Sequence, residues 1–493
     1  MITALAASAT LLLTIQIGKS DITPSESLPM GGYTERGAKG FEPGGDRLYS
    51  RAIVLRQGRT RIAVVSVEML TVPESLVREV RARLPKDVKL FLTATHTHSA
   101  PDSQMLNERM TMNVPGIANF RPRWLDWYAE RIAGSVLAAL GSKVRPIQSL
   151  LIKRLHLPLN RGRREGAMPD QTATAIVAGT KPLWFHYAAH AIFKDSDNLK
   201  LSGDWPGAMS GAGYSVLTGA IGDASPVADG ANAAARIATF KLKALEAIAQ
   251  TGRDALRRVQ KSLPRRDALR RVRQSLPRRD ALLRVRKSLP RRDALRRVQK
   301  SDATMLGPDG AGPSHMDDTM LGPDGAGPSN AGSSNAGPSN AVPFQMAWAS
   351  VPIELAPTSA HPDFARRNGI PPALAQDLVS RFAPREARIS ALRIGSLAVV
   401  GIPGEPTSVL GRQIVAEGRR LGFYPVLVVS HVNGWMGYIL DPEDYDRGGY
   451  EATLSFYGRE QGSKVLDAAK LAFGDLRSSA RAFDHHNMCV YGE

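Results

Sequence analysis

The chain has 493 residues, of which 43% are hydrophobic, so it can bury a large core and is long enough for two or three domains. Its one cysteine, Cys489, excludes an intrachain disulfide framework and leaves the redox compartment open. The net charge of +18 would suggest a nucleic-acid partner, but residues 253–342 alone hold 19 Lys and Arg against nine Asp. The other 403 residues therefore carry only +8, which is ordinary for a globular enzyme.

The N-terminal segment has two interpretations. Residues 1–15 are apolar enough to resemble a signal peptide, but no Lys or Arg precedes Lys19 and no small-residue cleavage site stands out. Alternatively, residues 11–17 form a buried first strand. No later run has the roughly 18–20 apolar residues needed to cross a bilayer, which argues against an integral membrane protein.

Strands and helices then follow one another. Residues 51–57 and 62–69 are strand-like and flank a turn at Gly58, which predicts a hairpin. Residues 74–84 have the apolar spacing of a helix, and residues 88–95 predict a buried strand. This order predicts a mixed α/β fold, in which helices pack on layered sheets.

The next segment continues the pattern. A helix is predicted over residues 124–140, and strands over residues 147–157 and 172–178. Ser202–Gly207 is predicted to be a polar loop, and an Ala-rich helix is expected from Ala231 to about Gln250.

The sequence repeats itself from Asp254 onward. The unit DALRRVQKSLPRR recurs with a period of 13, and a Gly/Pro/Ser-rich unit begins at Thr304 and again at Thr319. Because prolines interrupt every basic repeat, we expect a low-complexity, largely disordered insertion at 253–342 inside one domain formed by 1–252 and 343–493. Binding of nucleic acid or anionic lipid by the repeats is an alternative, although the basic block has no aromatic residue to stack on bases.

Ordered sequence resumes after the repeats. Strands are predicted over residues 342–355, 389–402 and 425–430. Between the last two, Pro403–Ser408 is predicted to cap an amphipathic helix, with Val409, Ile414 and Val415 facing inward.

Two histidines follow the strand at residues 88–95. Strand side chains alternate between faces, so His96 and His98 are expected to project to the same side, where they can address one metal or one substrate. An isolated His-x-His is explained as well by histidines packed in a core or rim. His186 and His190 would share a face of a helix, but their segment is not an HExxH motif.

Five stretches together suggest a family. ATHTHSAP from Ala94, FHYAAH from Phe185 with SGDWPG after it, GDASP from Gly222, PGEPTS from Pro403 and GYILDPEDYDRGGYEATL from Gly437 stand in a fixed order. In that order and approximate spacing they resemble the catalytic domain of the neutral/alkaline non-lysosomal ceramidases. The early stretches GKSDITP, GGY and DRLYSRAIVL match as well. That family consists of zinc-dependent amide hydrolases that cleave N-acylsphingosine to a fatty acid and sphingosine.

The resemblance implies a single large zinc-hydrolase domain of mixed α/β layers and a set of site residues. Zn²⁺ would be surrounded by His96, His190, Glu405 and Tyr438, which suits a catalytic zinc site with a position open for water. Zinc-activated water would attack the amide carbonyl. The residues expected to serve the substrate or the attacking water are His98, Tyr450, Ser225 and Arg161. Whether Ser225 is a nucleophile or positions the amide stays open.

The sequence also departs from the family pattern. Ala100 and Asp102 stand where ceramidases usually have glycines, Val227 replaces an Asn, and we expect no C-terminal immunoglobulin-like domain. The substrate could therefore be ceramide, another N-acyl lipid, or a non-lipid amide or ester. A degenerate enzyme domain with binding repeats is the remaining alternative.

The expected partner is a lipid or small-molecule amide. A peripheral membrane contact and the oligomeric state stay open, and a nucleic-acid partner is disfavoured because the positive charge lies in the repeats. The family resemblance implies a secreted or periplasmic location.

Overall fold

The computed structural model describes residues 12–262 and 345–481. The signal-peptide prediction concerns residues that lie mostly outside the described ranges. The same holds for nearly all of the repeat segment and therefore for the prediction that it is disordered. The described residues up to 257 and from 345 onward belong to one compact unit. Among the described residues, no helix has both the length and the apolar character that a membrane crossing requires.

The first part of the chain forms a five-stranded sheet in the order β4-β3-β2-β1-β5. Its neighbours are antiparallel except for β3 and β4, which are parallel. The predicted hairpin and the predicted strand before His96 are both confirmed. The strands are β1 (Thr14–Asp21), β2 (Tyr49–Gln57), β3 (Thr60–Val67), β4 (Val88–Ala94) and β5 (Arg145–Pro146).

Two four-stranded sheets follow, each with one parallel pair. The first has the order β10-β9-β8-β6 and the second the order β12-β13-β14-β16. Their strands are β6 (Leu150–His156), β8 (Thr172–Ala178), β9 (Lys181–Tyr187), β10 (Ser215–Thr218), β12 (Met346–Pro352), β13 (Arg388–Ile394), β14 (Leu397–Gly401) and β16 (Val426–Val429).

Two short strand pairs complete the β structure. These are β7 (Asn160–Gly162) with β11 (Ala224–Pro226), and β15 (Glu405–Pro406) with β17 (Tyr438–Ile439). The helices are α1 (Glu74–Ala82), α2 (Pro122–Leu140), α3 (Asp204–Ser210), α4 (Ala233–Ser262), α8 (Pro362–Asn368), α9 (Pro372–Phe382), α10 (Ser408–Arg420), α11 (Pro442–Asp446), α12 (Tyr450–Thr453) and α13 (Gln461–Arg481), with 3₁₀ turns η1 (Thr34–Arg36) and η2 (Ser103–Leu106).

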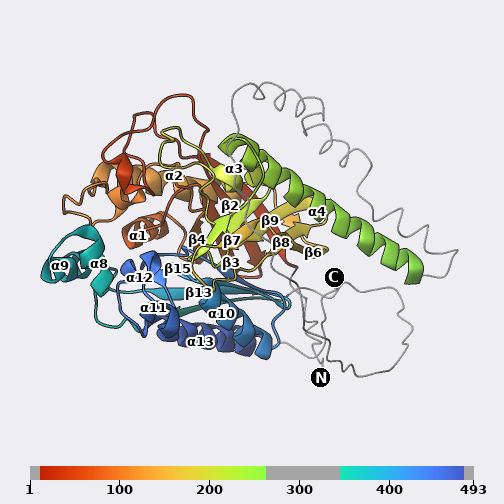
Figure 1. Ribbon diagram of the computed structural model, residues 1–493. Helices are drawn as coiled ribbons and strands as arrows, with labels where there is room; N and C mark the ends of the chain where they lie inside the picture. The colour runs from red at the N-terminus through yellow and green to blue at the C-terminus, as the bar shows by residue number, and fades with distance from the viewer. Residues whose placement is uncertain (1–11, 263–344, 482–493) are drawn as a thin grey trace, which may run out of the picture. The chain divides into compact units, whose positions relative to one another are not determined.

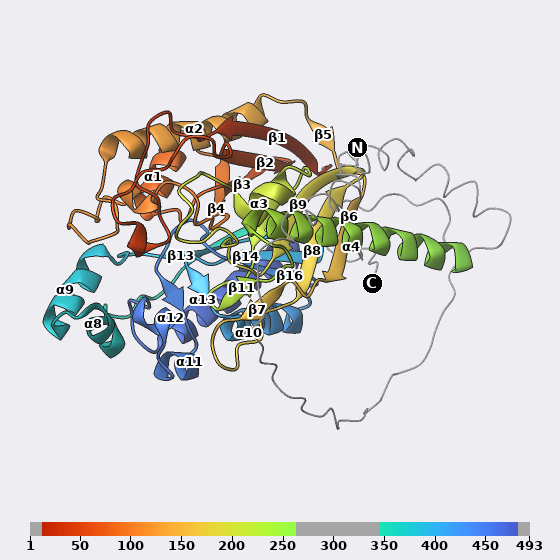
Figure 2. The ribbon, with the colours of Figure 1, turned by 45° about the horizontal axis from the view of Figure 1, so that its top comes forward.

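Both faces of the five-stranded sheet are buried, which explains why its strands read as apolar runs. In β2, Ala52 and Val54 face a core shared with α1 and α2. Ile53 and Leu55 face the opposite way, into a core shared with the two four-stranded sheets. Figures 1 and 2 show α1 and α2 against the first sheet, whereas α10 and α13 cover the sheet of β12–β14 and β16. The expected mixed α/β layering is confirmed.

Three local predictions differ from the structure. Ser202–Gly207, predicted as a loop, leads into the short helix α3. The Ala-rich helix continues to Ser262 rather than ending near Gln250. In α10 the buried large apolar side chains are Leu410 and, as predicted, Ile414, whereas Val409 and Val415 are only partly buried, because a different stripe of the helix faces α13 and β16.

Candidate metal centre and active site

His96 lies just beyond the end of β4, with a left-handed backbone φ of 59°. Its Nδ1 lies 2.8 Å from the carbonyl oxygen of Leu70, which fixes the ring and leaves Nε2 for another partner. In the described ranges, the other non-glycine residues with positive φ are Asp204, His431 and Asn433. This backbone conformation costs about 1–3 kcal/mol of folding free energy per residue, and residues that adopt it are often found at functional sites. A loop turn, rather than the strand alternation used for the prediction, therefore aims His96.

The side chain of His98 nevertheless lies next to that of His96. The Nε2 atoms of the two residues lie 3.2 Å apart, with the rings edge to face. Tyr33 packs edge-on against His98, with the ring centroids 5.0 Å apart. Arg36 donates a hydrogen bond to the main-chain oxygen of His98 at 2.6 Å. The Gly-Gly-Tyr segment near the N-terminus therefore positions His98.

Gly32 leaves no room for a side chain next to His98. A Cβ atom there would lie 2.5 Å from the His98 Nδ1, and the φ of +94° disfavours any other residue. We expect Gly32→Ala to displace the His98 ring and to lower turnover by about 10- to 100-fold, since small misplacements of active-site groups have effects of that size. Metal content should be unchanged, because His98 is not among the predicted ligands.

The control for this prediction is Gly37→Ala. Gly37 also has positive φ, 61°, but no atom lies within 4 Å of its added Cβ. Steady-state kinetics and metal analysis of both variants separate the clash from the backbone cost. Equal turnover in the two variants would contradict a positioning role for the Gly32 contact.

His190 follows β9 and is completely buried. Its backbone nitrogen and its Nδ1 lie 2.9 and 3.1 Å from the carbonyl oxygen of Ala224. The indole of Trp205 donates to the carbonyl oxygen of His190 at 2.9 Å. The hydroxyl of Thr97 donates to the carbonyl oxygen of Ser202 at 2.6 Å. The SGDWPG segment thus holds both His190 and the loop that follows β4.

Glu405 enters from β15, where it pairs in parallel register with Tyr438 of β17. Its side chain is buried, and its Oε1 accepts a hydrogen bond from the Trp435 indole at 3.0 Å. Asp223 of the GDASP turn accepts bonds from the backbone nitrogen and hydroxyl of Ser408 at 2.7 and 2.8 Å. The cap of α10 therefore comes from a distant segment and not from within PGEPTS, since the residue preceding the helix makes no side-chain cap.

The three side chains predicted as His and Glu ligands converge. Glu405 Oε2 lies 3.5 Å from His96 Nε2 and 3.4 Å from His190 Nε2. Two atoms that each bind one ion at about 2.0–2.2 Å are roughly 3–3.5 Å apart, so the spacing suits a shared metal. In the described part of the chain, His190 Nε2 and Glu405 Oε2 are buried without a hydrogen-bond partner. Each of these atoms can offer a lone pair, so the pair is suited to bind a metal ion.

The protonation state of His190 suits metal binding. Burial, followed by the charge of Arg163, lowers the pKa of His190 to about 3. Burial likewise lowers the pKa of His96. Both rings are therefore neutral near pH 7, which is the form that can donate a lone pair to a metal.

Tyr438 lies beside this group and is held by Arg163. Its hydroxyl accepts a hydrogen bond from Arg163 Nη2 at 2.8 Å, and Arg163 Nε donates to Glu451 at the same distance. Burial raises the pKa of Tyr438 well above its usual value, so the phenol keeps its proton. Tyr450, which is 50% exposed, lies with its ring centroid 5.9 Å from that of Tyr438.

Arg161 and Ser225 are less closely connected to the histidines. The two residues are paired across β7 and β11. Arg161 is exposed and lines a cavity of about 840 Å³ together with His186, and the contact with Tyr438 belongs instead to Arg163. Ser225 adjoins Ala224, and within the described residues no hydrogen bond joins its hydroxyl to His96, His190 or Glu405.

Two residues at the site were not singled out from the sequence. Arg163 stood in an Arg-Gly-Arg-Arg run that offered no way to choose among three arginines. His431 is fully buried and stacks on His96, with ring centroids 4.3 Å apart. His431 follows a buried strand, as His96 does, and this pattern could have identified it in the sequence as a candidate site residue. We call His96, His98, His190, Glu405 and His431 the His/Glu cluster; two triplets within it have ligand atoms within 4.8 Å of one another, His96–His98–His190 and His96–Glu405–His431.

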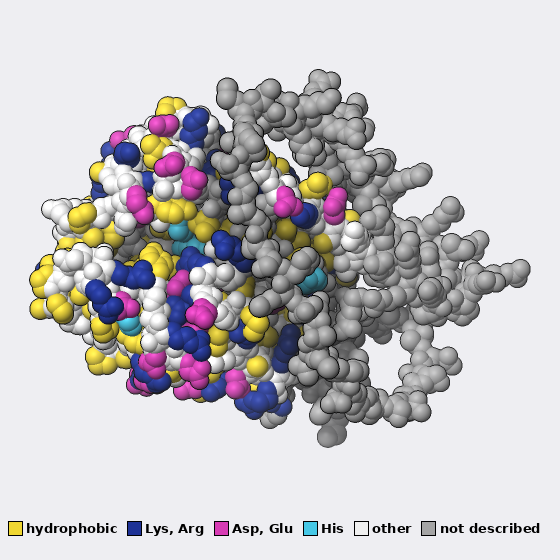
Figure 3. All heavy atoms as spheres, in the orientation of Figure 1, with side chains coloured by type: hydrophobic (Ala, Val, Ile, Leu, Met, Phe, Trp, Pro, Cys, Tyr) yellow, Lys and Arg dark blue, Asp and Glu magenta, His cyan; other side chains and the backbone are white. Residues whose placement is uncertain are grey.

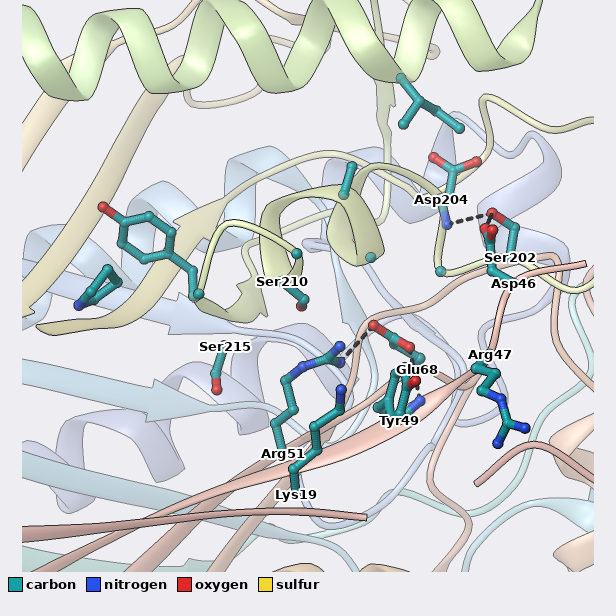
Figure 4. A pocket seen from close by; sticks show the side chains of 18 of the residues that line it. Lys19, Asp46, Arg47, Tyr49, Arg51, Glu68, Ser202, Asp204, Ser210 and Ser215 are labelled. Carbon is teal, nitrogen blue, oxygen red and sulfur yellow. Dashed lines mark hydrogen bonds and ion pairs between the residues drawn. The ribbon is translucent and has the colours of Figure 1, made fainter. Parts of the chain in front are cut away.

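Cavities differ in their relation to the cluster. Arg163 and Tyr450 line one of about 660 Å³. A histidine side chain is visible in a hollow on the face shown in Figure 3, with basic side chains beside it. Another cavity, of about 740 Å³, is shown in Figure 4, where Arg51 and Glu68 form an ion pair of 2.6 Å. Its lining contains no member of the His/Glu cluster.

Comparison by sequence finds local matches. A neutral ceramidase of Mycobacterium tuberculosis is 34% identical over 91 residues, which are 18% of this chain and 14% of that protein. Neutral ceramidase 3 of Arabidopsis thaliana is 29% identical over 105 residues, 20% of this chain and 14% of that protein. The chain therefore matches only about a seventh of the length of either curated relative. No family model matches the chain.

Comparison by structure reaches much further. The crystal structure of neutral ceramidase from Pseudomonas aeruginosa matches with a TM-score of 0.61 and 15% identity, over 98% of this chain and 77% of that one. A ceramidase complexed with C2 matches with a TM-score of 0.62 and the same identity and coverage. The resemblance to the neutral ceramidase family indicated by the motifs is confirmed: the described residues have the fold of a solved neutral ceramidase, and the chain shares sequence with two curated neutral ceramidases over shorter stretches.

Proposed function

We propose that this chain is a metal-dependent hydrolase of linear amides, ceramidase-like, with Zn²⁺ as its metal. One observation carries the proposal. On the fold of a neutral ceramidase, the Nε2 atoms of His96 and His190 lie 3.5 and 3.4 Å from the same carboxylate oxygen of Glu405. Within the described residues, His190 Nε2 and Glu405 Oε2 are buried without a hydrogen-bond partner. Burying such polar atoms is costly unless they bind something, and a metal ion would satisfy both.

The metal would be held by His96, His190 and Glu405, with Tyr438 adjacent. An imidazole and carboxylate set suits Zn²⁺, which lowers the pKa of water to about 7 and polarises a carbonyl oxygen. The chain supplies the supports that aim these ligands. Leu70 and Ala224 fix the two imidazoles through their carbonyl oxygens, and Trp435 fixes the carboxylate.

In the proposed reaction, two neighbouring residues handle protons and negative charge. Burial holds the pKa of His98 well below its usual value, so its ring is neutral and can accept a hydrogen bond from a water molecule. The Tyr438 hydroxyl accepts its hydrogen bond from Arg163, so its own hydrogen is available to an oxygen that gains negative charge. In the proposed reaction, Tyr450, which is exposed beside Tyr438, contacts the substrate.

The proposed substrate class is a lipid or small-molecule linear amide, with N-acylsphingosine first. Both curated relatives carry the name neutral ceramidase, and one solved neighbour is a ceramidase complexed with C2. Hydrolysis of N-acylsphingosine yields a fatty acid and sphingosine. The departures at Ala100, Asp102 and Val227 make a related N-acyl lipid or a non-lipid amide or ester the outcomes to compare.

The test combines metal analysis with an assay of amide cleavage. We expect close to one zinc per chain after metal-replete purification, and release of fatty acid from a fluorogenic ceramide that is lost on chelation and restored by zinc. Short acyl amides and esters in the same assay define the substrate class. Less than about half a zinc per chain, or turnover that survives chelation, would overturn the proposal.

The same assay addresses the repeats, which we propose are an insert in one catalytic domain. Because α4 reaches Ser262, the deletion should begin after that residue, with 263–342 replaced by a flexible linker. Zinc content and turnover are expected to survive. Loss of both would instead assign the repeats a part in the enzyme.

A further inference from the structure

The cavity of about 840 Å³ is lined by one face of the sheet of β6, β8 and β9 and by one face of α10. Arg154, Thr174 and His186 are paired across the three strands, so they form a row on the same face of the sheet, and all three line the cavity. Residues on the other face, such as Leu155 and Phe185, pack in an apolar core with α4. The polar face of this sheet is therefore the one that a ligand can reach.

Two buried acceptor atoms on residues that line this cavity have no hydrogen-bond partner within residues 12–262 and 345–481. The first is Nδ1 of His186: the Nε2 of the same ring lies 2.7 Å from the carbonyl oxygen of Val428 and must carry the hydrogen. Burial lowers the pKa of His186, so the ring is neutral near pH 7 and Nδ1 keeps a lone pair. The second is Oδ1 of Asn160, whose Nδ2 donates to two carbonyl oxygens at 2.9 and 2.6 Å. Buried acceptors of this kind are destabilising unless a donor reaches them.

The same cavity is basic. Its lining includes one acidic residue, the exposed Asp170, and four arginines: Arg154, Arg161, Arg412 and Arg419. The guanidinium carbons of Arg154, from β6, and Arg419, from α10, lie 5.1 and 5.6 Å from the ring centroid of Tyr424. Among the described residues, neither of these two guanidinium groups forms an ion pair with a carboxylate. Because two like charges held against one ring repel each other, an anion that reaches both would be stabilised.

We propose that this cavity is a second binding site, for a phosphate ester that also carries hydroxyl groups. The phosphate binds the guanidinium groups of Arg154 and Arg419, because guanidinium geometry matches that of phosphate oxygens. Hydroxyl groups of the same ligand donate to His186 Nδ1 and Asn160 Oδ1. The volume of about 840 Å³ is in the range of small-molecule sites. No member of the His/Glu cluster lines the cavity, so this site is separate from the candidate metal centre.

The test measures binding of two soluble probes to the full chain by isothermal titration calorimetry. Glycerol 3-phosphate joins a phosphate to hydroxyl groups, whereas sulfate is a tetrahedral anion with no hydrogen to donate. We expect glycerol 3-phosphate to bind with a Kd of about 1 mM or tighter. Arg419→Met should weaken the binding of both probes by about 10-fold or more, because a charge-assisted hydrogen bond is lost. His186→Gln should weaken glycerol 3-phosphate by about 3- to 10-fold and leave sulfate unchanged, because only the ester donates to Nδ1.

The matched control is Arg420→Met. Arg420 follows Arg419 on α10, but it pairs with Glu417 at 2.9 Å and does not line the cavity, so this variant should bind both probes as the wild type does. His186→Gln keeps a donor for the carbonyl oxygen of Val428, and thermal unfolding of each variant checks that it is folded. Because the exposed Arg419 is not needed for a folded core, its variant tests the site even if His186→Gln is unstable.

Vesicles that contain phosphatidylglycerol distinguish a lipid headgroup from a free phosphate ester. Vesicle binding that glycerol 3-phosphate displaces, and that Arg419→Met weakens but Arg420→Met does not, would assign the site to a headgroup. Binding of the soluble ester alone would assign it to a free ligand. Absence of saturable binding of either kind, or equal binding by Arg419→Met and the wild type, would overturn the inference. These measurements involve no amide hydrolysis, so their outcome is independent of the proposed function.

Discussion

Replacing His96 with alanine is expected to empty the metal site and abolish amide hydrolysis, whereas His98→Ala should leave the metal bound and slow the reaction. His96 Nε2 lies 3.5 Å from Glu405, and its other nitrogen is fixed by Leu70, which is the arrangement of a ligand with an outer support. His98 is the less buried of the two residues. Loss of a group that moves a proton typically lowers turnover by about 10²- to 10⁴-fold.

Two measurements separate these outcomes. Metal content per chain reports the ligand, and kcat for a fluorogenic amide reports the proton-handling group. The comparison is demanding, because the Nε2 atoms of His96 and His98 are only 3.2 Å apart and both belong to one candidate ligand triplet. If His98→Ala released the metal and His96→Ala retained it, the roles assigned to the two residues would be reversed.

The second large effect is expected at Arg163. Arg163→Met removes the hydrogen bond to Tyr438 and one of the two arginine partners of the buried Glu451 carboxylate. We expect turnover to fall by about 10²- to 10³-fold, as when one donor to a developing oxyanion is lost. Stability should fall by about 1–3 kcal/mol, since a buried hydrogen-bonded group loses a partner. Arg164 remains as the second partner of Glu451 and limits the loss.

Arg161→Met provides the direct comparison. Arg161 is the arginine that the family motif indicates, but its side chain is exposed and lines another cavity. Kinetics of both variants, with thermal unfolding to follow stability, decide between them. A larger loss of kcat for Arg161→Met than for Arg163→Met would show that the motif names the right residue and that the contact with Tyr438 is incidental.

Local structure was largely predictable from the sequence. The hairpin of β2 and β3, the strand β4, and the helices α1 and α2 follow from apolar spacing that repeats over one or two turns or pleats. The burial of β4 was expected from its apolar run, whereas the burial of both faces of the sheet became evident only in the structure. Two helices were predicted wrongly at their limits: α3 was predicted as a loop, and α4 was predicted to end near Gln250. Most of a helix's stability comes from packing against neighbouring elements, and the glycine-containing start of α3 and the polar repeats at the end of α4 do not reveal that packing.

Side-chain convergence was predictable only in part. The family motifs named His96, His190 and Glu405, which come from three distant segments, and the structure brings them together. Strand alternation correctly predicted that His98 lies beside His96, but for the wrong reason, because His96 lies in a left-handed turn after the strand. The choice of Arg163 over Arg161 depends on where Tyr438 and Glu451 lie, and no local pattern contains that information.

The sequence by itself determined the layered α/β class, the isolation of the positive charge in the repeats and the set of motifs that carries the candidate chemistry. Only the tertiary structure decided which atoms face one another: that Asp223 caps α10, that Gly32 meets His98, and that His431 lies buried against His96. The physical reason is the range of the interactions. Helix and strand periodicity is set by residues a few positions apart, whereas each of these contacts joins segments that only the packing of separate sheets brings within a few ångströms.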